Sequence, residues 1–230
     1  MLVEQSTLGR IVVPEVLPGG RALFYTTLDF RGRVDAPVAR QIADVIRDRF
    51  GVEATLATCT QVHGVTVQRA SPSPDWQECD SCDALWTAEA RVALGIKVAD
   101  CLPVTLIEGD VIANIHSGWR GTVRGVTAAT LDAAPIDPAK AFAYLGPSIR
   151  VCCFEVGEEV AAQFDEQFVD RSYAKPHVDI PAFTVHILRT RRFAAERIFD
   201  SGLCTRCEGS IFHSFRRDGK GGSNLTVVAQ

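Results

Sequence analysis

The sequence predicts one globular domain, residues 1–230, that contains both strands and helices. A chain of 230 residues can bury a sufficient core within a single domain, without disulfide staples. The proportions of 47% hydrophobic and 23% charged residues are those of an ordinary soluble globule. Short apolar runs and segments with helical spacing follow one another, with no internal repeat and no linker long enough to separate domains.

The first 83 residues contain two predicted strands, one helix and one loop. Residues 22–28 and 54–60 are apolar or β-branched, which is typical of strands. Between them, apolar residues recur at helical spacing from Pro37 to Phe50, and Gly51 is expected to end this helix. Residues 71–83 contain two prolines, serines and acids, which predicts a loop.

The middle of the chain predicts three neighbouring buried strands followed by a helix. Residues 91–98, 102–107 and 111–116 are short apolar runs that turn-forming residues separate. The glycine-rich stretch 118–134 then predicts a loop that feeds a helix. Its glycines indicate a backbone that bends tightly or approaches a ligand closely.

The C-terminal third is expected to contain a strand, two helices and a final hairpin. The strand covers residues 141–146, one helix begins at Gly157 and Glu158, and another covers 182–200. The hairpin is expected to pair residues 211–215 with residues 225–230 across the turn RRDG.

Charge and hydropathy exclude two classes of partner. The chain has 24 basic and 28 acidic side chains, for a net charge of −4, and no basic run, so nucleic-acid binding is not expected. About 18 uninterrupted apolar residues would be needed for a membrane helix, and none occur. The first residues also lack the pattern of a secretory signal, so we expect a cytoplasmic protein without a membrane partner.

Cysteine, histidine and methionine content limits the metal chemistry. Eight cysteines without a secretory signal fit reduced thiols or metal ligands better than a disulfide framework. Five histidines and a single methionine are too few for a site that holds several copper ions. A multicopper polyphenol oxidase is therefore the least favoured function.

Three residues at the ends of predicted strands, close to glycines, are candidates for a reactive site: His63, Cys101 and His116. The first interpretation is that the three side chains converge on one metal ion. Their intervals match no local zinc pattern, so the second interpretation is a buried thiol and two hydrogen-bonded histidines. A third interpretation is a metal-free hydrolase, in which Cys101 is the nucleophile and His116 the base.

Two Cys-x-x-Cys pairs form a second candidate metal site. The pairs are Cys79 with Cys82 and Cys204 with Cys207, and four thiolates in such spacing commonly bind a tetrahedral structural zinc ion. The alternative is that these thiols are free, because 121 residues separate the two pairs.

Six blocks of the sequence together resemble the YfiH-type family, also called laccase-domain or polyphenol-oxidase-like. They appear in the family's order over about residues 55–230. The blocks are QVHG at 61–64, CDALWT at 82–87, VALGIKVADCLPVTL at 92–106, IHSGWRGTVRGV at 115–126, YLGPSIRVCCFEVGEEV at 144–160 and FHSFRRDG at 212–219.

The resemblance implies an α+β domain with mixed β-sheets flanked by helices. It also implies one catalytic zinc ion, bound by His63, Cys101 and His116, with the fourth coordination position open. Members of the family are described as purine nucleoside phosphorylases, with phosphate as co-substrate and adenosine, inosine or methylthioadenosine as substrate, and as adenosine deaminases. Another role attached to the family is that of an editing or binding factor in cell-wall precursor metabolism.

Other polar residues are candidates for roles beside such a zinc ion. Asp100 is a candidate proton shuttle, and otherwise it caps the turn or orients a ligand histidine. Arg120 is a candidate for binding phosphate, and otherwise it begins a surface helix. Further candidates for substrate binding are Gln61, Arg216 and Arg217, although arginines in such a turn are often only solvated.

The N-terminal segment departs from the family pattern. The chain reads FYTTLDFRGRVDAP from Phe24 where the family has an Arg-x-Gly-Gly-Val-Ser run, so the preferred nucleoside is not implied. Phe24, Tyr25 and Phe154 are candidates for stacking on a purine, or else core residues.

Overall fold

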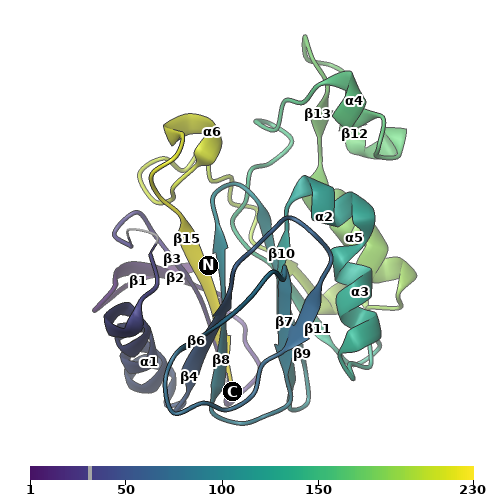
Figure 1. Ribbon diagram of the computed structural model, residues 1–230. Coiled ribbons are helices and arrows are strands. Elements are labelled where there is room, and N and C mark those ends of the chain that lie inside the picture. Colours follow the sequence, from purple (N-terminus) through teal and green to yellow (C-terminus); the bar gives the residue numbers. More distant parts are fainter. Residues whose placement is uncertain (31–32) are drawn as a thin grey trace.

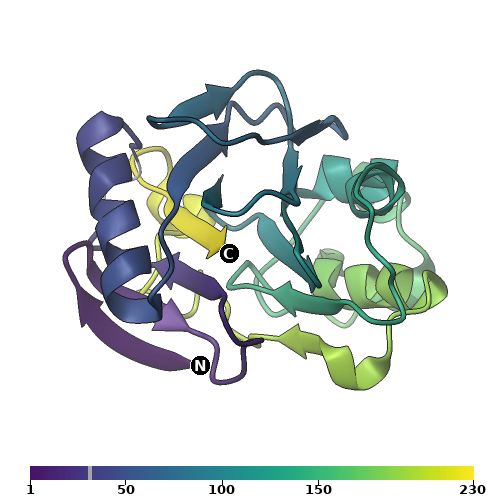
Figure 2. The same cartoon turned by 90° about the horizontal axis from the view of Figure 1, so that it is seen from below.

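Two β-sheets pack face to face and each carries helices on its outer side, which gives four layers (Figures 1 and 2). A computed structural model describes residues 1–30 and 33–230. Arg31 and Gly32, part of the segment that departs from the family pattern, lie outside the described residues. The arrangement confirms the prediction of an α+β fold with mixed sheets flanked by helices.

The first sheet has seven strands and its edge is formed by the N-terminus of the chain. Their order is β1-β2-β3-β15-β8-β4-β6, antiparallel except that β4 runs parallel to β8 and β6. The strands are β1 (Leu2–Ser6), β2 (Gly9–Val13), β3 (Ala22–Thr26), β4 (Thr55–Cys59), β6 (Gln77–Cys79), β8 (Val92–Val98) and β15 (Asn224–Ala229).

The second sheet has six strands in the order β14-β11-β9-β10-β7-β5. Its end pairs, β11 with β14 and β5 with β7, are parallel. The strands are β5 (Val67–Arg69), β7 (Ala84–Thr87), β9 (Leu102–Glu108), β10 (Val111–Ser117), β11 (Phe142–Leu145) and β14 (Ile198–Asp200). A separate two-stranded ribbon pairs β12 (Val169–Asp170) with β13 (His177–Val178).

The helices are short apart from two. They are α1 (Ala36–Phe50), α2 (Trp119–Arg124), α3 (Val126–Ala133), α4 (Glu158–Ala161), α5 (Ile180–Thr190) and α6 (Phe215–Asp218), with 3₁₀ turns at Glu166–Phe168 and Ala195–Arg197. Asp35 caps the start of α1, and Gly51 ends it as predicted, in a left-handed conformation. Among the described residues, no helix combines the length and apolar character that a bilayer crossing requires.

Three apolar clusters hold the layers together. One lies between α1 and the seven-stranded sheet and includes Ile42 and Phe24. Another lies between the sheets and includes Tyr25 and Tyr144, while the third joins the six-stranded sheet to α3 and α5. Burial of these faces supplies the main driving force for folding.

Two predictions about the first half of the chain were wrong in part. The segment 71–83 contains β6, because Cys79 and its neighbours pair with β4. The three runs from 91 to 116 are strands, but only β9 and β10 are neighbours. Asp100 has a φ of 80°, and at this corner the chain leaves the seven-stranded sheet and enters the six-stranded sheet.

Two predictions about the C-terminal part were also wrong in part. The helix expected over 182–200 ends at Thr190, and residues 198–200 instead pair with β11 as β14. The final hairpin does not form, because β15 pairs with β3 and β8. The expected turn belongs to α6, where the side chain of Ser214 caps the helix by accepting from Arg217 N.

Candidate metal centre and adjoining cavity

His63, Cys101 and His116 meet where strands from both sheets end. His63 lies in the loop after β4, Cys101 lies in the turn from β8 to β9, and His116 is near the end of β10. Sγ of Cys101 is 3.9 Å from Nε2 of His63, and the two imidazole rings pack edge to face with centroids 4.7 Å apart. One donor atom from each of the three side chains lies within 4.8 Å of the others. The predicted convergence of these residues is present in the structure.

The three side chains differ in burial, which leaves one side of the group open. His116 is 3% exposed, Cys101 is partly exposed and His63 is exposed. His63 has a φ of 58°, a left-handed conformation that a histidine adopts only where its surroundings fix it. The group therefore has a buried inner edge and an accessible outer edge.

Asp83 holds the His116 ring and the backbone of the His63 loop, and the sequence analysis did not identify it. Nδ1 of His116 donates a hydrogen bond to the Asp83 carboxylate over 2.8 Å, so Nε2 is the ring nitrogen directed at Cys101. The same carboxylate accepts hydrogen bonds from the backbone N–H groups of residues 62, 63 and 64. Its only signal in the sequence is an acid directly before the apolar run Ala84–Thr87; its full burial appears only in the structure.

The charges of the site favour a thiolate beside a protonated imidazole. Burial raises the pKa of the Cys101 thiol, but hydrogen bonds from His116 and His63 outweigh it and lower the pKa to about 6. Burial disfavours the charged form of His116, yet its bonds to Asp83 and Cys101 raise its pKa to about 9. Burial likewise opposes ionisation of Asp83, but the bond from His116 and the backbone donors lower its pKa.

We expect alkylation of Cys101 in the metal-free protein to follow a midpoint near pH 6. The thiolate is the reactive form, so the rate should be constant above about pH 7 and fall as the pH drops through 6. An ordinary thiol would instead lose reactivity below about pH 8.5. Mass spectrometry of the peptide that contains Cys101, after iodoacetamide pulses from pH 5 to 9, measures this, and a midpoint above 8 would contradict it.

Gly118 allows the three side chains to approach one another. A Cβ at this position would lie 3.1 Å from Sγ of Cys101 and 3.1 Å from Cδ2 of His63. Gly121, one turn into α2, similarly lies against the carbonyl oxygen of Gly64, which a Cβ would meet at 2.9 Å. These glycines therefore let the backbone lie close to the candidate ligand side chains and to the His63 loop.

Gly118→Ala should weaken metal binding by about tenfold, because crowding in a packed site costs about 1–3 kcal/mol. Its φ of −67° suits alanine, so the backbone itself is not strained. Isothermal titration of the metal-free protein with zinc measures the change. Gly19→Ala, at a glycine with open space around it, is the control, and equal affinities for both variants would argue against this packing role.

A cavity of about 250 Å³ opens beside the group. This volume is close to the lower end of those usual for small-molecule sites, about 300 Å³. Trp119, Phe154 and Phe215 contribute aromatic surface, and the arginines Arg120 and Arg216 contribute positive charge. The remaining lining residues are His63, Ala99, Asp100, Cys101, Ile149 and Ile180.

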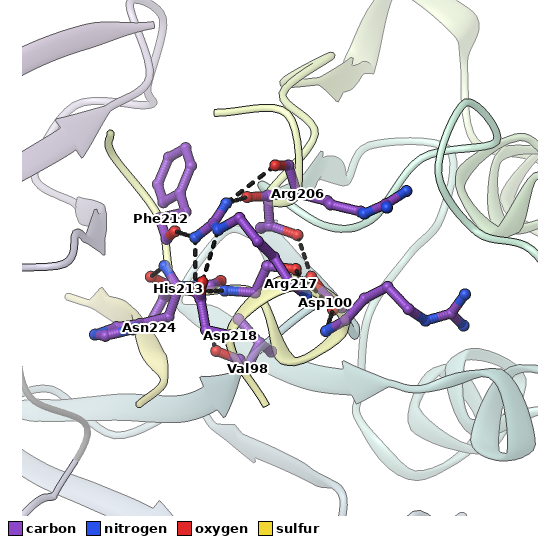
Figure 3. A network of polar contacts seen from close by, with 11 residues as sticks. Val98, Asp100, Arg206, Phe212, His213, Arg217, Asp218 and Asn224 are labelled. Atoms are coloured by element: carbon purple, nitrogen blue, oxygen red, sulfur yellow. Dashed lines mark hydrogen bonds and ion pairs between the residues drawn. The ribbon is translucent and has the colours of Figure 1, made fainter. Parts of the chain in front are cut away.

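The carboxylate of Asp100 is occupied by three hydrogen-bond donors. It accepts from the hydroxyls of Thr205 and Ser214 over 2.6 and 3.1 Å, and from the backbone N–H of Arg216 over 2.7 Å (Figure 3). These bonds join the β8–β9 corner to α6. This arrangement supports the interpretation that Asp100 organises the turn, rather than the one in which it shuttles protons.

The other predicted polar residues divide into two groups. The amide of Gln61 donates to the carbonyl of Lys97 and accepts from the N–H of the same residue. The guanidinium of Arg217 donates to the carbonyls of residues 205, 206 and 212 (Figure 3). Neither side chain lines the cavity. Arg120 and Arg216 do line it, with Arg120 stacked 4.2 Å from the ring centroid of Trp119.

Of the three predicted stacking residues, only Phe154 lines the cavity. Phe24 and Tyr25 belong to strand β3, and both are buried in the core. Phe215, which the sequence analysis did not single out, lines the cavity and is 54% exposed.

The two Cys-x-x-Cys pairs do not come together. Cys82 lies beside Cys59, and Cys79 pairs with Cys59 across β4 and β6. Cys204 and Cys207 instead lie with Cys152 and Cys153, since Ser148 and Cys204 form a parallel bridge that joins those two segments. The predicted four-cysteine set is thus replaced by a different one.

The sequence profile of the family described as multi-copper polyphenol oxidoreductase laccase matches residues 25–230. The chain therefore belongs to this family, as the YfiH-type blocks predicted. A Bacillus licheniformis protein named YfiH has the same fold, with a TM-score of 0.80 at 21% identity over 91% of this chain and 92% of that one. A Neisseria meningitidis protein gives 0.79 at 23% identity over 95% and 98%.

Relatives in sequence carry the names of enzymes. A purine nucleoside phosphorylase of Pseudomonas aeruginosa is 35% identical over 73% of this chain and 71% of its own. One from Streptomyces coelicolor is 32% identical over 87% and 86%. The adenosine deaminase RL5, from an unknown prokaryote, is 35% identical over 61% of this chain, which spans only 58% of that protein.

Proposed function

We propose that this chain is a zinc-dependent purine nucleoside phosphorylase that also deaminates adenosine and cleaves methylthioadenosine, acting as a cytoplasmic enzyme. The observation that carries the proposal is the group His63, Cys101 and His116, with its accessible edge on a cavity lined by aromatic and basic side chains. The names of the relatives supply the reaction classes.

The donor set fits a catalytic zinc ion. Two imidazoles and one thiolate are ligands that zinc prefers, and a catalytic zinc ion has three protein ligands. A nitrogen at about 2.0 Å and a sulfur at about 2.3 Å from one tetrahedral zinc ion lie about 3.5 Å apart. The 3.9 Å between Cys101 Sγ and His63 Nε2 is close to this value. When bound, zinc supplies Lewis acidity at an open coordination position.

Cavity residues would hold and orient the reactants. In phosphorolysis, a phosphate oxygen bonds to the anomeric carbon of the ribose while the bond to the purine breaks, and the base leaves with that electron pair. Arg120 and Arg216 place positive charge where the phosphate dianion would bind. In deamination, water adds to the purine carbon and ammonia leaves. Both reactions bind a purine nucleoside, so the same aromatic walls of the cavity would hold the base in each of them.

Phe215→Ala should raise KM for adenosine about tenfold and leave the zinc content unchanged, because stacking of a base on an aromatic ring is worth about 1–3 kcal/mol. Phe215 lines the cavity but is not one of the three candidate ligands. Steady-state kinetics of Phe215→Ala and Phe215→Tyr measure the effect, with Tyr173→Ala as an exposed aromatic control outside the cavity. If KM of Phe215→Ala equals that of the control, Phe215 does not bind the base.

The proposal is tested by incubating the zinc-loaded protein with adenosine, with and without phosphate. Adenine and ribose 1-phosphate should appear only with phosphate, and inosine should form without it. A chelator should stop both reactions. Failure to convert adenosine, inosine and methylthioadenosine would refute the proposal, while activity that survives the chelator would favour a Cys101–His116 dyad.

A further inference from the structure

Four cysteines lie together outside the candidate catalytic group: Cys152, Cys153, Cys204 and Cys207. Their sulfur atoms all lie within 4.8 Å of one another. Cys153 and Cys204 are buried, whereas Cys152 and Cys207 are exposed. The cluster therefore sits at the surface with its inner half in the protein.

The distances between these sulfur atoms match a tetrahedral thiolate site. Sγ of Cys207 is 3.4 Å from that of Cys153 and 3.8 Å from that of Cys152, and Cys152 and Cys153 are 3.7 Å apart. Four sulfurs at about 2.3 Å from one zinc ion are separated by about 3.8 Å. A disulfide would require about 2.05 Å, so all four thiols remain available as ligands.

The backbone presents the four thiols from two tight turns. In the first turn, the carbonyl of Arg150 accepts hydrogen bonds from the N–H groups of Cys153 and Phe154, which directs two adjacent cysteines to one place. The second is a Cys-x-x-Cys turn, in which Sγ of Cys204 accepts from the N–H groups of residues 206 and 207. Arg150 N–H donates to the same sulfur from the first turn.

We propose that Cys152, Cys153, Cys204 and Cys207 bind one structural zinc ion. Four protein ligands complete a tetrahedral shell, so this ion would have no position for a substrate. Soft thiolate ligands in tetrahedral geometry select zinc over magnesium or calcium. The proposal does not depend on the catalytic activity proposed above.

The zinc ion would join the segment that contains Cys152 and Cys153 to the segment that contains Cys204 and Cys207. Both segments lead into the cavity. Beside the cluster, backbone hydrogen bonds from Ser148 to Leu203 and from Thr205 to Ser148 connect them, and Arg150 forms an ion pair with Asp200. The first segment carries Ile149 and Phe154, and the second leads into Phe215 and Arg216 of α6. Loss of the ion should therefore destabilise the cavity wall as well as the local fold.

Metal analysis of the purified full chain tests the site. We expect two zinc ions per chain in the wild type and one in the double variant Cys204→Ser with Cys207→Ser. The Tm of that variant should fall by about 5 °C or more. Cys79→Ser, a partly buried cysteine outside the cluster, should keep both ions. A double variant with unchanged zinc content, or iron in place of zinc, would overturn the assignment.

A second measurement covers the case in which the double variant does not fold. In the variant His63→Asn, whose catalytic group lacks one ligand, the remaining metal can be exchanged for cobalt. A tetrathiolate site should give intense sulfur-to-cobalt charge-transfer absorption and the visible bands of tetrahedral cobalt. Absence of these bands, or a mass two units lower from a disulfide among the four cysteines, would contradict the proposal.

Discussion

His63→Asn should remove the catalytic metal and lower kcat/KM for adenosine by at least about 1,000-fold, since a bound metal supplies several kcal/mol of transition-state stabilisation. Asparagine suits this position because His63 has a φ of 58°, and asparagine adopts the left-handed conformation at little cost. Loss of activity would then reflect the missing imidazole and not a strained backbone. Zinc analysis and steady-state kinetics measure the two effects.

The control for this prediction is His186→Asn, which makes the same change at an exposed histidine of α5 outside the cavity. Its zinc content and kcat/KM should equal those of the wild type. A His63→Asn variant that keeps more than a tenth of the activity would show that His63 is not a ligand on which catalysis depends.

Asp83→Ala should destabilise the fold by about 3–5 kcal/mol and weaken zinc binding by about 10- to 100-fold. The carboxylate is fully buried and accepts from His116 and from three backbone N–H groups of the His63 loop. Alanine would leave the buried His116 ring and these partly buried N–H groups without an acceptor. Urea unfolding measures the first effect, and zinc titration of the folded protein measures the second.

Asp83→Asn separates the two roles, because an amide keeps an acceptor oxygen but no charge. It should lose less stability than alanine and still bind zinc more weakly than the wild type. Asp132→Ala, at a surface carboxylate paired with Arg191, should change neither quantity appreciably. If Asp83→Ala behaves like this control, Asp83 does not support the site.

Local patterns predicted most of the elements. The spacing of apolar residues and Gly51 defined α1, and the apolar runs of the middle third became β8, β9 and β10. The pattern could not place β8 in one sheet and β9 in the other, because this depends on the left-handed backbone of Asp100. The final hairpin was wrong for a related reason, since β15 has two long-range partners that a local turn signal does not reveal.

The three candidate ligands were singled out by their position at the ends of predicted strands, and their assignment to one zinc ion came from the resemblance and not from spacing. His63, Cys101 and His116 are separated by 38 and 15 residues, and only the meeting of two sheets brings them together. Asp83 was missed because a single buried acid has no distinctive pattern. The cysteine set was only half correct, since Cys152 and Cys153 have no metal-binding spacing of their own and approach Cys207 through the fold.

The central claim is that one zinc ion binds to His63, Cys101 and His116 and keeps an open position toward the cavity. Anomalous diffraction from a crystal of the zinc-loaded protein, recorded on both sides of the zinc absorption edge, tests it most directly. The account predicts an anomalous peak about 2.3 Å from Cys101 Sγ and about 2.0 Å from one nitrogen of each histidine. A crystal without zinc at these three residues, or with a fourth protein side chain bound to the ion, would contradict it.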